Sequence, residues 1–558
     1  MKLIYILLNR KIKSAVFYSL LLIFSLALLS SCIKNALDKV PTDSYSDGAV
    51  WKDANLIELF VNNTYRVVTT GFSDRAVKLS GVTDECYRRG GGNNFINSGN
   101  LTPSQVGLLE FWTDGRGCSY WTAITKCNIF FSNIEKSPVE ISLKNRMTGE
   151  MKFLRAYAYF RLVAYYGGVP LLKTPFELTG DFNLPRNTYD ECMNFVITEL
   201  DDAANLLPLT YSNDNLGRIT KGAALAAKSR ALLYMASPLN NPTNSAIKWQ
   251  AAADAAKAVI DLNIYSLYPN YKDQFLRVNS YNSESILSRP YNYSVSPEDA
   301  TLELVEYPNG YSGFGQLGPL QNLVDDFEMA NGIIPKNDPA YNPQNPYVNR
   351  DPRFYATILF DGAPFKGREV ETFLPGGKDS KEGSIEAFNA SETGYYIRKF
   401  IDESITNPSE VNQGNSPWIF FRYAETLLNY AEAKFFLGDE TTCRQYINMV
   451  RSRPDVNMPP VTESGAALLT RLQHERRIEL VFEEHRWFDV RRWKTAPVEL
   501  NKLPQRINIV KNLTTGVKTY TINTMAQYKF VFTDKNYLLP IPQSERDKNS
   551  LLEQNPGY

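Results

Sequence analysis

Two helices joined by a short turn constrain the fold of this chain more than any other feature of its sequence. Residues 422–451 (RYAETLLNYAEAKFFLGDETTCRQYINMVR) contain two apolar helical patterns separated by Gly438 and Asp439. Small and aromatic residues lie where the two helices would face each other, as they do in a tetratricopeptide-like hairpin. The repeat of about 34 residues typical of such proteins is not sustained elsewhere, so the sequence does not predict a regular solenoid.

Helical periodicity extends over most of the chain, and one loop-rich stretch interrupts it. We expect helices over residues 52–68, 120–134, 150–166, 189–206, 221–236, 249–262, 418–437, 440–453 and 466–493. Residues 266–414 are dense in Pro, Gly, Asn and Tyr, which favours loops that carry binding residues on a rigid scaffold. From Pro497 onward the pattern favours short strands and turns. We therefore predict a mostly α fold: a tetratricopeptide-like helical scaffold with a loop-rich ligand-binding portion and minor β structure.

The first residues have the pattern of a secretory signal. Basic residues precede an uncharged apolar run over residues 14–29, which is the arrangement of an n-region and an h-region. The run ends in Leu29-Ser30-Ser31-Cys32, which resembles a bacterial lipobox, so we expect residues 1–31 to be removed and Cys32 to carry the lipid. The alternative is an uncleaved anchor, because residues 14–33 contain no charge and could span about 30 Å of membrane. In either case the rest of the chain lies outside the cytoplasm.

The charge balance and the scarcity of histidine exclude several classes of protein. The chain has 60 basic and 60 acidic residues, whereas a nucleic-acid binder normally carries a basic excess. Its two histidines, His474 and His485, belong to no HExxH motif, and no EF-hand loop is present. We therefore predict no cofactor and no transition-metal site, and leave calcium bound by carboxylates and carbonyls open. Scattered cysteines favour free thiols as much as a bridge between Cys86 and Cys118.

A charged helical segment lies near the C-terminus, at residues 475–493 (ERRIELVFEEHRWFDVRRW). Glu475, Glu479 and Glu483 recur every four residues, so they share one face of a helix. Because like charges at that spacing repel, we expect basic residues of other elements to neutralise them in a structural ion network. A glycosidase needs two carboxyls at a defined separation across a cleft, and the sequence singles out no such pair.

Aromatic and polar residues in two loop segments are candidates for binding a sugar. Sugar recognition combines aromatic rings against the apolar face of the sugar with amides and guanidiniums at its hydroxyls. Such residues gather in 84–95 and 281–314. A GxGxxG pattern at residues 313–318 lacks the flanking strand and helix of a dinucleotide site, so we interpret it as a flexible loop. The predicted ligand-binding residues are Tyr87, Arg88, Asn93, Tyr291, Tyr293, Tyr311 and Phe314, and no catalytic residue is predicted.

Several segments together resemble the SusD/RagB family of Bacteroidetes. They are the charged segment 475–493, RYAETLLNYAEA at 422–433, FLRAYAYFRLVAYYGGVP at 153–170, and LPIPQ at 539–543 with QNPGY at 554–558. The matches follow the family's order from the lipobox to the last residue. This resemblance divides the chain into a signal peptide (1–31), a helical N-terminal part (32–265) and a C-terminal part (266–558). The C-terminal part is then loop-rich over 266–414, helical over 415–495 and an irregular tail over 496–558.

The resemblance also implies a function. Members of this family are non-enzymatic lipoproteins of the outer membrane, facing the cell surface, built on four tetratricopeptide-like helix pairs. They capture oligosaccharides, or peptides in some members, and deliver them to a SusC-like TonB-dependent transporter. The alternatives that the residues leave open are a lipid-anchored glycoside hydrolase and a peptide-binding or assembly scaffold lipoprotein. The sequence does not identify the glycan.

Overall fold

The computed structural model describes residues 13, 16, 18, 19, 47–68, 72, 79–90, 94–112, 120–176, 180, 182–292, 302–408 and 416–558. Residues 58–135 and 140–558 form one compact unit, and residues 1–57 and 136–139 belong to a second. The predicted lipidation site Cys32 and the candidates Asn93 and Tyr293 lie outside the described residues. None of the helices in the described ranges is long and apolar enough to cross a membrane.

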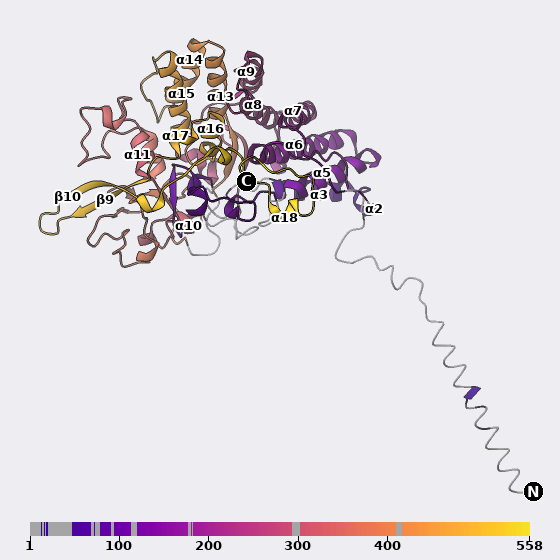
Figure 1. The fold of residues 1–558 in the computed structure, drawn as a ribbon, viewed down its shortest axis with the longest axis horizontal. Coiled ribbons are helices and arrows are strands. Elements are labelled where there is room, and N and C mark those ends of the chain that lie inside the picture. The colour runs from indigo at the N-terminus through magenta and orange to yellow at the C-terminus, as the bar shows by residue number, and fades with distance from the viewer. Residues whose placement is uncertain are drawn as a thin grey trace, which may run out of the picture. The chain divides into compact units, whose positions relative to one another are not determined.

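Successive helices pack on one another to form the scaffold of the larger unit (Figure 1). Its long helices are α5 (Tyr120–Asn133), α6 (Ile141–Tyr166), α7 (Tyr189–Leu206), α8 (Lys221–Ala236), α9 (Ala246–Ile260), α13 (Tyr423–Phe436), α14 (Glu440–Arg451) and α15 (Gly465–Glu479), and α3 (Ala54–Val68) precedes them. Each of α5 to α9 contacts the next, α9 contacts α13, and α13 contacts both α14 and α15. The predicted mostly α fold with tetratricopeptide-like helix pairs is therefore confirmed.

Local signals fix several of these helix ends. The Thr188 side chain accepts a hydrogen bond from the backbone N–H of Glu191, whose carboxylate accepts one from Thr188 N, which makes a capping box at the start of α7. Thr220 caps α8 in the same way through Ala223 N. Gly438 takes a φ of 82° between α13 and α14, a left-handed conformation that glycine adopts without strain.

Small and aromatic side chains fill the space between the scaffold helices. Trp249 of α9 stacks on Phe436 of α13 with ring centroids 4.1 Å apart, and alanines of α8 and α9 allow the helices to approach closely. Between α13, α14 and α15, buried Leu427, Leu428 and Ile447 form part of a continuous core. Each fully buried leucine or isoleucine contributes about 1.5–3 kcal/mol relative to exposure, so this cluster stabilises the stack of helices substantially.

Short strands and short helices make up the loop-rich part and the tail. The described residues contain five antiparallel pairs: β1 (Cys86–Arg88) with β3 (Leu317–Pro319), β2 (Ser285–Arg289) with β8 (Trp418–Arg422), β4 (Ile358–Leu359) with β7 (Tyr396–Ile397), β5 (Pro364–Phe365) with β6 (Arg368–Glu369), and β9 (Gln505–Lys511) with β10 (Lys518–Thr524). The short helices are α2 (Asp47–Val50), α4 (Asn94–Asn97), α10 (Leu302–Glu306), α11 (Gln321–Asp326), α12 (Pro352–Thr357), α16 (His485–Arg492), α17 (Ala496–Glu499) and α18 (Gln543–Arg546).

Two of the expected helices differ from the structure. Residues 418–422 are not the first turn of a helix but strand β8, because their backbone pairs with β2. The helix expected over 466–493 is broken between α15 and α16, where Phe482 and Glu484 each take a φ of 62°. Neither glycine nor proline marks this break, so local sequence gives no signal for it.

Candidate functional site

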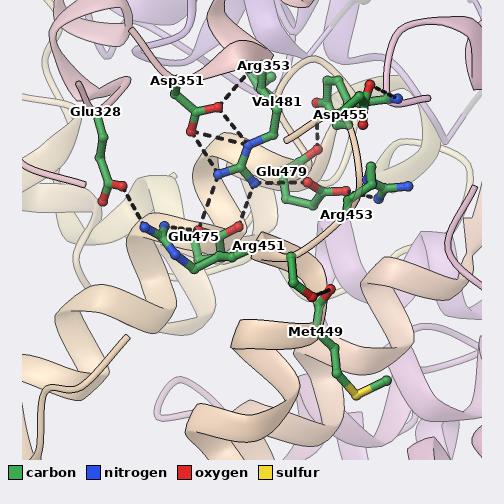
Figure 2. Close-up of polar contacts among 12 residues, drawn as sticks. Glu328, Asp351, Arg353, Met449, Arg451, Arg453, Asp455, Glu475, Glu479 and Val481 are labelled. Atoms are coloured by element: carbon green, nitrogen blue, oxygen red, sulfur yellow. Dashed lines mark hydrogen bonds and ion pairs between the residues drawn. The ribbon is translucent and has the colours of Figure 1, made fainter. Parts of the chain in front are cut away.

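Glu475 and Glu479 lie on helix α15 at the centre of a buried ion network (Figure 2). Arg353 of α12 donates to Glu475 Oε1 at 2.5 Å and to Glu479 Oε2 at 3.0 Å, and it also pairs with Asp351 at 2.9 Å. Arg451, the last residue of α14, donates to Glu475 Oε2 at 2.7 Å. The prediction that basic residues of other elements neutralise these glutamates is confirmed.

Further arginines connect this network to strand β8 and to the residues before β2. Arg453 donates to Glu284 Oε2 at 2.5 Å and to Glu479 Oε1 at 2.8 Å. Arg422, at the end of β8, donates to Glu284 and Glu479 at 2.7 Å each and to Glu483 Oε2 at 2.7 Å. The network therefore ties helical scaffold and loop-rich part together through charges that are removed from solvent.

The arginines keep the buried carboxyls ionised. Burial alone would raise the pKa of Glu475, but the charges of Arg353 and Arg451 outweigh it and lower that pKa to about 2. The pKa of Glu479 is lowered further below its usual value, because Arg453, Arg422 and Arg353 outweigh its burial. A buried carboxylate that loses such partners is strongly destabilising, so each member of the network depends on the others.

Side chains from distant elements also donate hydrogen bonds to backbone carbonyls at the C-terminal end of helix α15. The carbonyl oxygen of Glu479 accepts hydrogen bonds from Arg422 Nη2 at 2.7 Å and from Tyr271 Oη at 2.9 Å. The carbonyl of Val481 accepts one from Lys399 Nζ at 2.9 Å. These donors replace the backbone N–H groups of a following helical turn, so the chain can turn between α15 and α16 without leaving those carbonyls unpaired.

The same charged segment holds the start of the first predicted binding loop. Arg477 of α15 donates to Asp84 Oδ2 at 2.5 Å, and Arg486 of α16 makes two hydrogen bonds to the Asp84 carboxylate at 2.8 Å each. Burial would raise the pKa of Asp84, but the two guanidiniums outweigh it and hold that pKa well below its usual range. Asp84 lies two residues before β1, so its contacts with α15 and α16 fix the chain just ahead of this strand.

Strand pairing brings the two predicted binding segments together. Tyr87 of β1 lies opposite Gly318 of β3, and Arg89 N donates to Gln316 O at 2.8 Å. A Cβ atom at Gly318 would lie 2.6 Å from Thr393 Oγ1, so the chain around residue 393 packs closely over β3. Residues near 88, 314 and 390 therefore meet on one part of the loop-rich portion.

Two exposed phenylalanines and two arginines form a candidate binding surface there, which we call the platform: Arg88, Arg89, Phe314 and Phe388. Phe388, on the 3-10 helix η10 (Ala387–Asn389), is 78% exposed, and Phe314 is 38% exposed. Arg89 Nη1 donates to Phe388 O at 2.8 Å, which connects the first loop to η10. Next to Phe314, a Cβ atom at Gly315 would lie 3.0 Å from Asn389 O, so this loop also packs on η10.

The other predicted ligand residues lie in internal contacts. Tyr87 is buried, with its ring centroid 4.3 Å from that of Tyr528. Tyr291 is also buried, and its hydroxyl accepts a hydrogen bond from Phe72 N at 3.0 Å. Tyr311 lies beneath the Arg368 guanidinium at 3.9 Å and donates its hydroxyl to a backbone carbonyl. Their part in ligand binding stays a prediction.

Phe388 was not among the residues predicted from the sequence. Arg89 lies in the predicted segment 84–95, but its contact with η10 depends on a residue about 300 positions away. Phe388 stands in a short stretch, residues 385–390 (IEAFNA), with no sustained helical or strand pattern around it. A large aromatic residue in such a loop segment is the signal that could have marked it as a candidate for a binding surface.

Carboxyls with raised pKa values are buried rather than arranged across a cleft. Burial raises the pKa of Glu85 and of Glu303 to about 7 and that of Glu306 to about 8. Each accepts a backbone hydrogen bond, and each is almost fully buried. Cleavage of a glycosidic bond needs acid and base groups that face the substrate. In the described part of the chain no three His, Cys, Asp or Glu residues are grouped so that they could hold a metal ion.

A stack of tetratricopeptide-like helices that carries a loop-built aromatic surface defines a binding protein on a helical scaffold. The chain belongs to the SusD family, whose sequence model matches residues 275–558, and a model described as "Starch-binding associating with outer membrane" matches residues 70–233. The resemblance seen in the sequence is therefore confirmed. The second description supports association with the outer membrane; lipidation at Cys32 stays a prediction.

Solved structures agree with this assignment. A SusD-like protein of Bacteroides fragilis is 31% identical, with a TM-score of 0.79 over 93% of this chain and 100% of that one. A SusD-like carbohydrate-binding protein of the same species is 27% identical, with a TM-score of 0.77 over 90% of this chain and 100% of that one. A laminarin-binding SusD-like protein shares the fold at 24% identity and a TM-score of 0.66, over 90% of this chain and 99% of that one.

Proposed function

We propose that this protein captures an oligosaccharide on the platform and delivers it intact to a SusC-like TonB-dependent transporter. In this proposal Cys32 carries the lipid that anchors the protein at the outer membrane, facing the cell surface. The observation that carries the proposal is the pairing of β1 with β3, which brings the segment of exposed Phe314 to Arg88 and Arg89, together with the Arg89 hydrogen bond that connects exposed Phe388 to them. Family membership and the carbohydrate-binding and laminarin-binding relatives support it.

The chemistry of the platform suits a sugar. An exposed phenylalanine ring can pack against the apolar face of a pyranose, and a guanidinium can donate several hydrogen bonds to ring hydroxyls. The β1–β3 pairing and the Asp84 contacts with Arg477 and Arg486 hold this surface in place before a ligand arrives. A surface ordered in advance loses less entropy on binding, so more of the contact energy is retained as affinity for the sugar.

Calorimetry with the detergent-solubilised mature lipoprotein tests the proposal. The titrants are starch, laminarin and short oligosaccharides of each, and every sample is chromatographed afterwards. We expect saturable binding and intact carbohydrate. Phe388→Ala should weaken binding about tenfold, which corresponds to losing about 1.4 kcal/mol of stacking.

The matched control replaces an exposed apolar residue of the scaffold. Ile247→Ala on α9 removes a side chain that is as exposed as Phe388 but lies on a different element, and it should bind like the native protein. Cleaved product would overturn the non-enzymatic part of the proposal in favour of a lipid-anchored hydrolase. Absence of binding across the panel would favour a peptide-binding or assembly function instead.

Delivery is tested separately. A tagged form of the mature protein, isolated from outer membranes in mild detergent, should carry a TonB-dependent transporter with it in near-stoichiometric amount. Recovery of the lipoprotein alone from membranes that contain such transporters would contradict the delivery step while leaving glycan capture intact.

A further inference from the structure

A groove that shares no residue with the platform lies beside strand β2. It consists of two adjoining clefts of about 390 Å³ and 260 Å³, lined by α3, the connection between α7 and α8, and β2. Both clefts share the residues Leu216, Gly217, Arg218, Tyr281, Leu287 and Ser288. Ligand pockets in proteins typically measure about 300–1,000 Å³, so the groove is large enough for an oligosaccharide segment.

Tyr281 lines both clefts of the groove. Its side chain is 48% exposed, and its hydroxyl makes no hydrogen bond to the described residues. The ring rests on Gly217. A Cβ atom at that position would lie 2.8 Å from Tyr281 Oη, so any larger residue would clash with the tyrosine. A half-exposed tyrosine without a polar partner is an aromatic surface available to a ligand.

Polar side chains without partners line the larger cleft. Asn62 and Arg66 of α3 and Asp214 of the α7–α8 connection have no hydrogen-bond or ion-pair partner within the part of the chain that the structure describes. They supply an amide, a guanidinium and a carboxylate on one side of Tyr281. One positive and one negative charge balance each other, which favours an uncharged ligand with many hydroxyls over an anionic one.

The floor of the groove is rigid. Arg218 donates to Glu58 Oε1 at 2.7 Å and contacts both oxygens of Glu150 at 3.3–3.4 Å. Arg146 pairs with the same two carboxylates at 2.6 and 3.0 Å. These ion pairs satisfy Arg218 and hold it in place. Arg289 also lines the larger cleft, with its guanidinium 4.8 Å from the centroid of the Tyr291 ring, so Arg66 and Asp214 are the charged lining residues without a partner among the described residues.

We propose that this groove is a second carbohydrate subsite, which binds a neutral polysaccharide chain laid across Tyr281. The proposal rests on the glycan-binding function proposed above. A chain stacked on Tyr281 places neighbouring sugar residues in the two clefts, with Asn62, Arg66 and Asp214 at the hydroxyls in the larger one. The groove and the platform together give a long polysaccharide two points of attachment, and this raises its avidity over that of a short oligosaccharide.

The test measures binding of starch and laminarin, and of short oligosaccharides of each, to the full mature protein and three variants in detergent. Tyr281→Ala should weaken polysaccharide binding about tenfold and leave short oligosaccharides that fit the platform unchanged. Phe388→Ala should weaken both. Val278→Ala is the matched control, because Val278 is 87% exposed, lies with Tyr281 in the connection between α9 and β2, and does not line the groove.

A second readout locates the ligand directly. Hydroxyl-radical footprinting with mass spectrometry should show Tyr281 and Leu216 protected by the polysaccharide that binds, also in the Phe388→Ala variant. Unchanged polysaccharide affinity in Tyr281→Ala with no protection of Tyr281 would overturn the subsite and leave the platform proposal standing. Failure of the native protein to bind any carbohydrate tested would overturn both.

Discussion

Replacing Glu479 by glutamine should destabilise the protein more than almost any other single removal of charge. Its side chain is 0% exposed, and its carboxylate accepts hydrogen bonds from Arg353 at 3.0 Å, Arg422 at 2.7 Å and Arg453 at 2.8 Å. In Glu479→Gln a neutral amide faces three buried guanidiniums. Removing one partner of a buried ion pair costs about 3–5 kcal/mol, and the three contacts place Glu479 at the upper end, about 5 kcal/mol.

Urea unfolding followed by far-ultraviolet circular dichroism measures this change in the free energy of unfolding. The control is Asp261→Asn, which removes an exposed ion pair with Lys257 on α9 whose partners are 57% and 43% exposed. Such surface pairs contribute about 0.5 kcal/mol or less. A loss below about 1 kcal/mol for Glu479→Gln would refute the view that this network couples the scaffold to the loop-rich part.

Three further predictions concern stability in acid, stability between pH 5 and pH 8, and lipid anchoring. Because the pKa of Glu475 is lowered to about 2, its stabilisation is complete above its unfolded pKa near 4.5 and is lost as pH falls towards 2; Glu475→Gln should remove about 3 kcal/mol of this acid dependence in thermal unfolding scans. The contribution of Glu306 to stability changes with pH in the opposite direction, because burial raises its pKa to about 8. Its protonated form stabilises the folded state fully below about pH 4.5, and this stabilisation is lost as the pH rises through 8. Glu306→Gln should therefore flatten the decline in stability between pH 5 and pH 8 by on the order of 4 kcal/mol, and an unchanged slope would contradict burial of the charge. Cys32→Ala should abolish metabolic labelling with palmitate, and persistent labelling would show that another residue carries the lipid.

Helix interiors and several helix ends could be predicted from the sequence because local physics determines them. The expected helices over 189–206 and 221–236 coincide with α7 and α8, whose first turns are capped by Thr188 and Thr220. The helical hairpin at 422–451 was also predicted, apart from its first residue. Apolar periodicity and caps act over a few residues, so a single sequence displays them.

The features that depend on distant partners could not be predicted. Residues 418–422 look like a helix start until β2, more than 100 positions earlier, pairs with them. The break after Glu479 is stabilised by Tyr271, Lys399 and Arg422, none of which lies in the same helix. The platform could not be predicted for the same reason: the β1–β3 register brings its two predicted segments together, and a hydrogen bond from Arg89 connects them to Phe388.

The charged segment 475–493 is consequently connected by direct ion pairs to the loop that leads into the platform. Arg477 and Arg486 form ion pairs with Asp84, just before β1. Glu475 and Glu479, on one face of α15, form ion pairs with arginines of α12, α14 and β8. The loop-rich part also buries apolar side chains such as Phe327, Phe354 and Tyr395, and the directional charge-assisted hydrogen bonds add a fixed orientation to that packing. The ion pairs with Asp84 thus fix the first loop of the platform on the helices α15 and α16. The exposed side chains of the platform take no part in these ion pairs, so they stay available to a ligand.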